Sequence, residues 1–263
     1  MNLPPTPDAM PLPAGADGHA HIRAEGVTVT RGSRRVLDDV SVTLSPPRSR
    51  VAVVGENGCG KTTLLHVLAG LITPDEGTVH RTGTIGLARQ ELSARDGETV
   101  GTLTSEALAA SLAALAALDE AALAMAGGDP AAEGRYTAAL DAASRLDAWD
   151  AERRVDVALE ALGACADRDR PLSTLSVGQR YRVRLACLLG ARHDVLLLDE
   201  PTNHLSPALV DELTDAIRGT SAAVVVATHD RQLLRDLADW PRLEVGETPA
   251  RGDRSGASRP RGG

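Results

Sequence analysis

Gly55-Glu-Asn-Gly-Cys-Gly-Lys-Thr-Thr63 is the stretch of sequence that decides the fold of this chain. It follows the apolar run Val51–Val54, typical of a buried strand, and leads into a helical pattern over Thr62–Gly70. The stretch fits G-x-x-x-x-G-K-[ST], in which backbone N–H groups and a helix N-terminus converge on phosphate oxygens. The sequence therefore predicts a strand, a phosphate-binding loop (the P-loop, residues 55–63) and a helix.

Lys61 is the only lysine among the 28 basic residues. An ammonium group is a compact point charge, whereas arginine is a planar fork, and this loop position requires the former. We expect Lys61 to reach the β- and γ-phosphates and the Thr62 hydroxyl to lie on Mg2+. The other loop residues expected to bind the nucleotide are Gly55, Asn57, Gly58, Gly60 and Thr63.

A second candidate strand, Val195–Leu198, ends in Asp199 and Glu200. A carboxylate at the carboxyl edge of a sheet can hold Mg2+, which indicates that role for Asp199. Glu200 is suited to orient and deprotonate an attacking water.

The remaining patterns indicate an α/β fold. Ile22–Thr30 and Val36–Leu44 alternate like half-buried antiparallel strands, and Val79–Ala88 indicates two further short strands. Strands then alternate with helices, which predicts a parallel sheet covered on both faces. The expected later elements are helices at 177–190, 207–217 and 230–237, and strands at 195–198 and 222–227.

Thr104–Gly163 is rich in Ala, Leu and acidic residues and predicts three or more helices, with breaks at Gly127–Pro130 and Gly134. Residues 91–164 contain 5 arginines and 14 acidic residues, a net charge of −9, which matches a solvated helical face. We expect one domain at 21–246, with 91–175 as a helical subdomain, between tails at 1–20 and 247–263.

The composition narrows the class of protein. The chain has 263 residues, 43% of them hydrophobic, and a net charge of −8, which argues against disorder and against a mainly electrostatic nucleic-acid binder. Apolar runs such as Val195–Leu198 and Ala222–Ala227 are far shorter than the ~20 residues of a membrane span. With three widely spaced cysteines, these features predict a cytoplasmic protein without direct membrane insertion.

Leu175-Ser-Val-Gly-Gln179 resembles the signature motif of ATP-binding-cassette (ABC) ATPases. Gln90 resembles the glutamine of the Q-loop, and His229 resembles the switch histidine. The resemblance implies a P-loop NTPase fold, the ABC nucleotide-binding domain, with an antiparallel β subdomain and an enlarged helical subdomain. It implies that Gln90 senses Mg2+ and water, and that His229 contacts the γ-phosphate. It also implies that Ser176, Gly178 and Gln179 close on ATP bound to a different cassette.

A finer resemblance is to the ABC-F branch, whose members lack membrane domains and act on ribosomes. It rests on Asp199-Glu-Pro-Thr-Asn-His-Leu205, Gln179-Arg-Tyr-Arg-Val-Arg184, Gln90-Glu91, Thr228-His-Asp-Arg231 and the arm-like stretch Leu146-Asp-Ala-Trp-Asp-Ala-Glu-Arg-Arg154. Within that branch the sequence is most similar to macrolide-type antibiotic-resistance proteins.

The chain also departs from that branch. It contains one set of cassette motifs, so a composite ATP site requires a copy of the chain or another cassette, in a head-to-tail pair. Ser206 stands where the branch usually has Asp, and the aromatic residue that stacks on adenine is replaced by Arg31 or Val36. The acidic arm disfavours direct contact with RNA phosphates.

The resemblance implies an ATP hydrolase in translation or ribosome-protecting antibiotic resistance, active on pairing, with ATP and Mg2+ as its ligands. Two alternatives stay open. The first is the nucleotide-binding subunit of a membrane exporter, with a permease as partner. The second is a nonhydrolytic module that uses ATP only to dimerise or to regulate another cassette.

Overall fold

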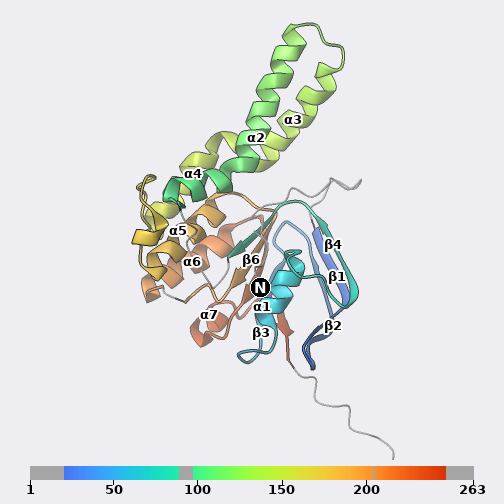
Figure 1. Cartoon of the computed structure of the whole chain (residues 1–263), viewed down its shortest axis with the longest axis vertical. Helices are drawn as coiled ribbons and strands as arrows, with labels where there is room; N and C mark the ends of the chain where they lie inside the picture. The colour runs from blue at the N-terminus through green and yellow to red at the C-terminus, as the bar shows by residue number, and fades with distance from the viewer. Residues whose placement is uncertain (1–20, 89–96, 204, 247–263) are drawn as a thin grey trace, which may run out of the picture.

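The computed structural model describes residues 21–88, 97–203 and 205–246, which form two sheets and a set of helices (Figure 1). The first sheet is antiparallel, in the order β2-β1-β4, from β1 (His21–Arg31), β2 (Arg34–Leu44) and β4 (Glu76–Thr82). Val27 and Leu37 are among its buried side chains. The predicted antiparallel pair is therefore confirmed.

The second sheet is parallel throughout, in the order β5-β6-β7-β3-β8. Its strands are β3 (Arg50–Val54), β5 (Ile85–Ala88), β6 (Val195–Asp199), β7 (Ala223–Ala227) and β8 (Arg242–Glu244). Every residue of β6 and β7 is buried, as continuous apolar runs predict for a central strand. The two short strands expected within Val79–Ala88 exist, but β4 and β5 belong to different sheets.

Alternate residues of β6 and β7 face two separate cores. Leu196 and Leu198 pack with side chains of α5 (Val177–Gly190), α6 (Pro207–Gly219) and α7 (Arg231–Asp236). Val195 and Leu197 pack on the other side, with α1 (Lys61–Leu68) and the antiparallel sheet. The parallel sheet is thus covered on both faces, which fixes the strand ends that carry the site.

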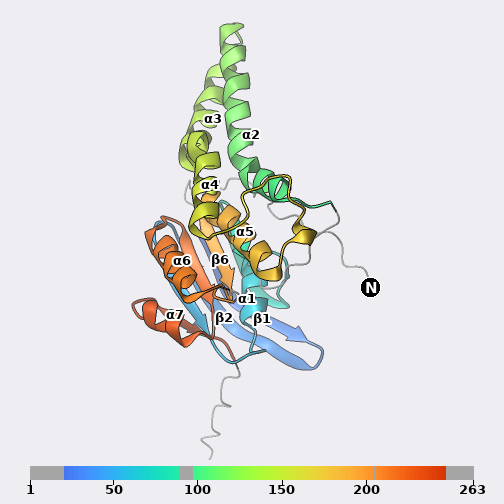
Figure 2. The ribbon, with the colours of Figure 1, turned by 90° about the vertical axis from the view of Figure 1, so that its left-hand side faces the viewer.

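The helical segment contains α2 (Val100–Ala126), α3 (Ala132–Leu146), the short helix η1 (Ala148–Asp150) and α4 (Ala151–Ala161). Figures 1 and 2 show α2 and α3 as a hairpin that projects away from the sheets, with α4 at its base. The turn at Gly127–Pro130 was predicted correctly. The break predicted at Gly134 is wrong because this glycine lies inside α3, where the surrounding turns tolerate it. A last 3-10 turn, η2 (Leu172–Thr174), precedes α5.

Among the described residues, α2 alone is long and apolar enough to cross a membrane by length and composition. Its most apolar 18-residue window has a mean hydropathy of 1.6, and 22% of that window is buried. Alanine supplies much of this hydropathy, and scattered polar residues interrupt it.

The expected tails at 1–20 and 247–263 lie outside the described residues, as do Gln90 and Glu91. The subdomain limits 91–175 remain a prediction.

Candidate functional site

The P-loop, Asp199, Glu200 and His229 lie at the carboxyl ends of three neighbouring parallel strands. The P-loop follows β3, Asp199 ends β6 with Glu200 directly after it, and His229 lies two residues after β7. Since β7 lies between β6 and β3, all three strand ends meet at one edge of the sheet. This edge is where open α/β sheets bind their ligands.

The P-loop has a backbone that only glycine adopts without strain at two positions. Gly60 caps the N-terminus of α1 with a φ of 113°. At Gly55 a Cβ would lie 2.3 Å from the carbonyl oxygen of Val245 and 2.5 Å from Sγ of Cys59. The loop therefore packs closely against the segment after β8, and the N-terminus of α1 ends the loop with free N–H donors.

Lys61 is buried at the start of α1, with 6% of its side chain exposed. Its Nζ donates hydrogen bonds to the carbonyl oxygens of Gly55 at 3.0 Å and Glu56 at 3.3 Å. The same Nζ lies 3.5 Å from Oε1 of Glu200. The ammonium thus joins the P-loop to the end of β6, and a buried charge of this kind must have such partners.

Thr62 and Asp199 form a pair of oxygen donors beside Lys61. The Thr62 hydroxyl donates a hydrogen bond of 2.8 Å to Oδ2 of Asp199. The other oxygen, Oδ1, is buried and has no hydrogen-bond partner among the described residues. Burial raises the pKa of Asp199, and the nearby Glu200 raises it further, while the bond from Thr62 lowers it. A free carboxylate oxygen beside a hydroxyl fits a hard divalent cation such as Mg2+.

Glu200 is held between β6 and the segment after β7. Its Oε2 accepts a hydrogen bond of 3.2 Å from the backbone N–H of His229 and lies 2.8 Å from Nδ1 of the same residue. The backbone of Glu200 is left-handed, with a φ of 48°, and its N–H donates to the carbonyl of Ala227 at 2.8 Å. The carboxylate is therefore fixed in direction, with 7% of the side chain exposed, whereas 52% of His229 is exposed.

The predicted signature residues lie at the start of α5 and not at the strand ends that carry the P-loop, Asp199 and Glu200. Ser176 caps the N-terminus of α5, where its side chain accepts a hydrogen bond of 3.2 Å from the N–H of Gln179. Ser176 is exposed, and Gly178 and Gln179 are partly exposed. Within the described ranges no hydrogen bond or ion pair joins these three residues to the P-loop.

The other nucleotide-binding candidates lie on the P-loop itself. Asn57 and Gly58 are exposed at its outer turn, and Thr63 is partly exposed in α1. Val36 lies against the loop, since its carbonyl oxygen is 2.7 Å from a Cβ built on Gly60. Arg31 is exposed near the end of β1. Gln90 cannot be placed because it lies outside the described residues.

Asp230 is a site residue that the sequence analysis did not single out. Its side chain accepts hydrogen bonds from the N–H groups of Gln232 at 2.7 Å and Leu233 at 3.3 Å, which caps α7 directly after His229. Thr202 hydrogen-bonds the same carboxylate, so the segment after Glu200 is tied to the segment that holds His229. Because Asp is a preferred N-cap residue, its position directly before a helical pattern could have predicted this cap from the sequence.

A glycine-rich loop capped by a helix, with Asp and Glu at the end of a neighbouring strand, defines a nucleotide-binding domain of the P-loop NTPase class. The sequence profile of the family described as ABC transporter matches residues 37–203. The chain therefore belongs to the ATP-binding-cassette family, and its relatives support the ABC-F branch.

Two curated relatives illustrate this. The chain is 37% identical over 220 residues to the energy-dependent translational throttle protein EttA of Mycobacterium tuberculosis, covering 81% of this chain and 38% of that protein. It is 38% identical over 227 residues to the tylosin resistance ATP-binding protein TlrC of Streptomyces fradiae, covering 82% of this chain and 40% of that protein. The chain thus spans about two fifths of the length of the curated relatives it matches.

Solved structures confirm the fold. The ATP-binding subunit of an ABC transporter superposes with a TM-score of 0.62 at 16% identity, covering 86% of this chain and 85% of that one. A bacterial Atm1-family ABC exporter with ATP bound gives a TM-score of 0.59 at 20% identity, covering 89% of this chain and 38% of that one.

Proposed function

We propose that this chain is an ABC-F-type ATPase that binds ATP with Mg2+, pairs with a second cassette and acts on the ribosome, in translation or in protection from an antibiotic. Support comes from relatives named as a translational throttle protein and as an antibiotic-resistance ATP-binding protein. The Asp199–Leu205 string agrees with that assignment. Because ribosomes are in the cytoplasm, the proposal also places the protein there.

The observation that carries the ATPase proposal is the convergence of Lys61, Asp199 and Glu200 at one sheet edge. Lys61 would exchange its present carbonyl and Glu200 contacts for phosphate oxygens, aided by the N–H groups of the P-loop. Release from Lys61 leaves Glu200 free to accept a proton from water attacking the γ-phosphate. His229, already in contact with Glu200, would then contact the γ-phosphate.

Mg2+, when bound, neutralises phosphate charge, and Thr62 and Asp199 would hold it. Gln90 is assigned to the same ion and to the attacking water by resemblance. The other P-loop residues proposed to contact the nucleotide are Gly55, Asn57, Gly58, Gly60 and Thr63.

Pairing is proposed because, in the part of the chain that the structure describes, no hydrogen bond or ion pair joins the signature residues to the P-loop. Ser176, Gly178 and Gln179 are accessible at the N-terminus of α5, where a helix end is an anion receptor. They would close on ATP bound to the P-loop of a second copy or of another cassette. The isolated chain is therefore expected to bind ATP but to hydrolyse it slowly, and ATP acts as a clamp on the pair.

The test uses the Glu200→Gln variant, which keeps the size of the side chain but cannot take a proton. The protein is sedimented through a sucrose cushion with purified ribosomes, with and without Mg-ATP. Pelleting that depends on ATP supports the proposal, and the matched variant Glu200→Gln with Lys61→Ala should stay in the supernatant.

Two other outcomes overturn parts of the proposal. ATP-driven dimerisation without pelleting would refute the ribosomal role and favour a transporter subunit with a permease partner. ATP binding with no turnover by the wild-type chain at any protein concentration would refute the ATPase and leave a regulatory module.

A further inference from the structure

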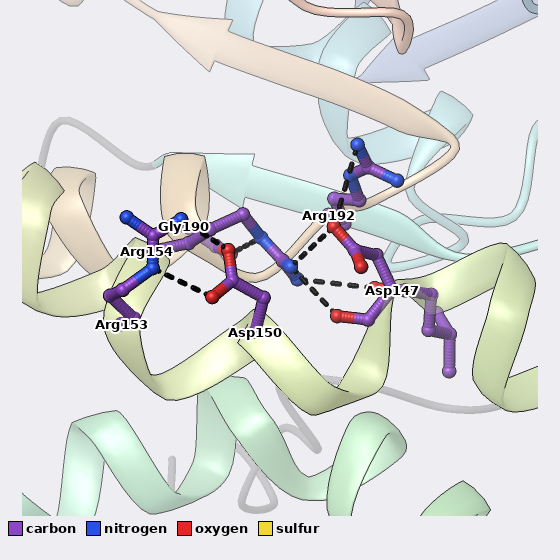
Figure 3. Close-up of polar contacts among 7 residues, drawn as sticks. Asp147, Asp150, Arg153, Arg154, Gly190 and Arg192 are labelled. Atoms are coloured by element: carbon purple, nitrogen blue, oxygen red, sulfur yellow. Dashed lines mark hydrogen bonds and ion pairs between the residues drawn. The ribbon is translucent and has the colours of Figure 1, made fainter.

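The base of the helical hairpin is joined to the signature helix α5 by a polar cluster. Figure 3 shows Asp147, Asp150, Arg153, Arg154 and Arg192 gathered beside Gly190. Asp147 is the C-cap residue directly after α3, Arg154 lies in the first turn of α4, and Gly190 ends α5. The end of α3, the start of α4 and the end of α5 therefore meet at this point. We name it the hairpin junction (Asp147, Arg154, Gly190 and Arg192).

Arg154 bridges the ends of α3 and α5 with one guanidinium group. Its Nε donates to the carbonyl oxygen of Gly190 at 3.1 Å. One terminal nitrogen donates to the carbonyl of Asp147 at 2.7 Å and to its carboxylate at 3.1 Å, and the other donates to the carbonyl of Leu146 at 3.1 Å. Its side chain is 19% exposed, so these contacts largely replace water.

The chemistry of these partners explains why an arginine stands here. The last carbonyls of a helix have no partner within the helix, and they form the negative end of its dipole. A planar cation with five donors can satisfy two such ends at once, which a lysine cannot do. The carboxylate of Asp147, also 3.7 Å from Arg192, balances the charge.

Backbone packing reinforces the junction. A Cβ on Gly190 would lie 2.6 Å from Cα of Val155 and 2.8 Å from its nitrogen. The backbone of α4 therefore rests directly on the last residue of α5. Val155 itself is fully buried. A displacement of α5 along or across this contact must displace α4, and with it the end of α3 that Arg154 holds.

We propose that Arg154 is a positioning residue that makes the hairpin move with the signature helix, so that nucleotide-driven pairing reorients α2 and α3 relative to the core. Ser176 and Gly178, at the other end of α5, are the residues that would meet the ATP of the second cassette. A displacement of α5 at its N-terminus is therefore transmitted to the hairpin through the junction, which lies at the other end of this 14-residue helix. This inference rests on the proposed ATP-driven pairing.

Arg153 supplies a matched control. It is the neighbour of Arg154 in sequence and also forms an ion pair, with Asp150, at 2.7 Å. That pair joins two residues three positions apart, and 74% of the Arg153 side chain is exposed. Removal of Arg153 deletes the same charge and side-chain volume without touching the ends of α3 or α5.

The experiment measures the distance between the hairpin and the core by pulsed electron spin resonance. Spin labels are placed on Leu123→Cys in α2, where the native side chain is 75% exposed, and on Asp215→Cys in α6, which is exposed. The full-length chain carries Glu200→Gln, is mixed with excess unlabelled protein, and has alanine at its three native cysteines, Cys59, Cys165 and Cys187. Spectra are recorded with and without Mg-ATP.

In the parent protein and in Arg153→Met we expect Mg-ATP to shift the distance distribution. In Arg154→Met we expect most of that shift to be lost, with ATP affinity retained, although the packing of Val155 on Gly190 remains. An unchanged shift in Arg154→Met, or no shift in the parent, overturns the proposal. If Arg154→Met does not fold, Arg154→Lys, which keeps the charge but cannot bridge both ends, must show the same loss. A parent shift that Arg154→Met loses and Arg153→Met keeps, found without ribosome pelleting, would uphold the junction and refute only the ribosomal role.

Discussion

His193 should make the folded chain lose stability in mild acid. His193 is a partly buried residue of the segment between α5 and β6, and its Cδ2 atom is 2.4 Å from a Cβ built on Gly86 of β5. Burial lowers the pKa of His193 to about 4, an effect that the nearby Asp194 opposes. The ordinary pKa of histidine is about 6.5. Between about pH 6.5 and pH 4, His193 is therefore protonated in the unfolded chain but neutral in the folded chain.

The size and sign of the effect follow from these two values. Above pH 6.5 both states are neutral and the residue has no effect. As the pH falls from about 6.5 to about 4, the unfolded state is stabilised, and the loss at pH 4.5 is on the order of 2 kcal/mol. Other groups also titrate in this range, so the wild type must be compared with His193→Leu, which replaces the imidazole by an apolar side chain of similar size that cannot titrate.

Urea unfolding of both proteins at pH 7 and pH 4.5 gives the required double difference. We expect the wild type to lose about 2 kcal/mol more than His193→Leu between the two pH values. Equal losses would show that His193 titrates alike in both states, and the account of its burial would be wrong.

Three further predictions concern the site. Lys61→Ala should weaken ATP binding by about 100-fold or more, because charge-assisted bonds to phosphate are lost, and isothermal calorimetry with wild-type affinity would contradict the P-loop assignment. Glu200→Gln should slow hydrolysis by about 100-fold or more while trapping an ATP-bound pair, and sedimentation unchanged by ATP would count against the clamp. Asp199→Asn should raise stability near pH 7, since burial raises the pKa of Asp199 and disfavours its ionised carboxylate. That gain should shrink as the pH falls through the raised pKa of Asp199, and a constant gain in thermal unfolding would refute this cause.

The sequence predicted the elements whose signals are local. The P-loop, β6 and the Asp199–Glu200 pair combine a residue pattern with a characteristic strand or helix, and the structure places them together. The helix predicted near 177–190 has these bounds in the structure, where the Ser176 side chain caps its N-terminus.

Features that depend on tertiary contact were not predictable. β8 has three residues and becomes a strand by pairing with β3. Gly134 is a helix breaker in isolation but stays helical within α3, which packs along α2. The role of Arg154 could not be predicted from the sequence, because its partners Asp147 and Gly190 lie at the ends of two other helices.

The solitary lysine of this chain has a practical consequence. Apart from the chain terminus, Lys61 is the one primary amine available to acylating or aldehyde reagents. Because 6% of its side chain is exposed and Glu200 lies 3.5 Å away, such a reagent must compete with that contact to react. Covalent labelling followed by mass spectrometry would therefore report occupancy of the P-loop from a single peptide, with ATP protecting it. The reactivity of this one lysine would thus measure nucleotide binding without any added probe group.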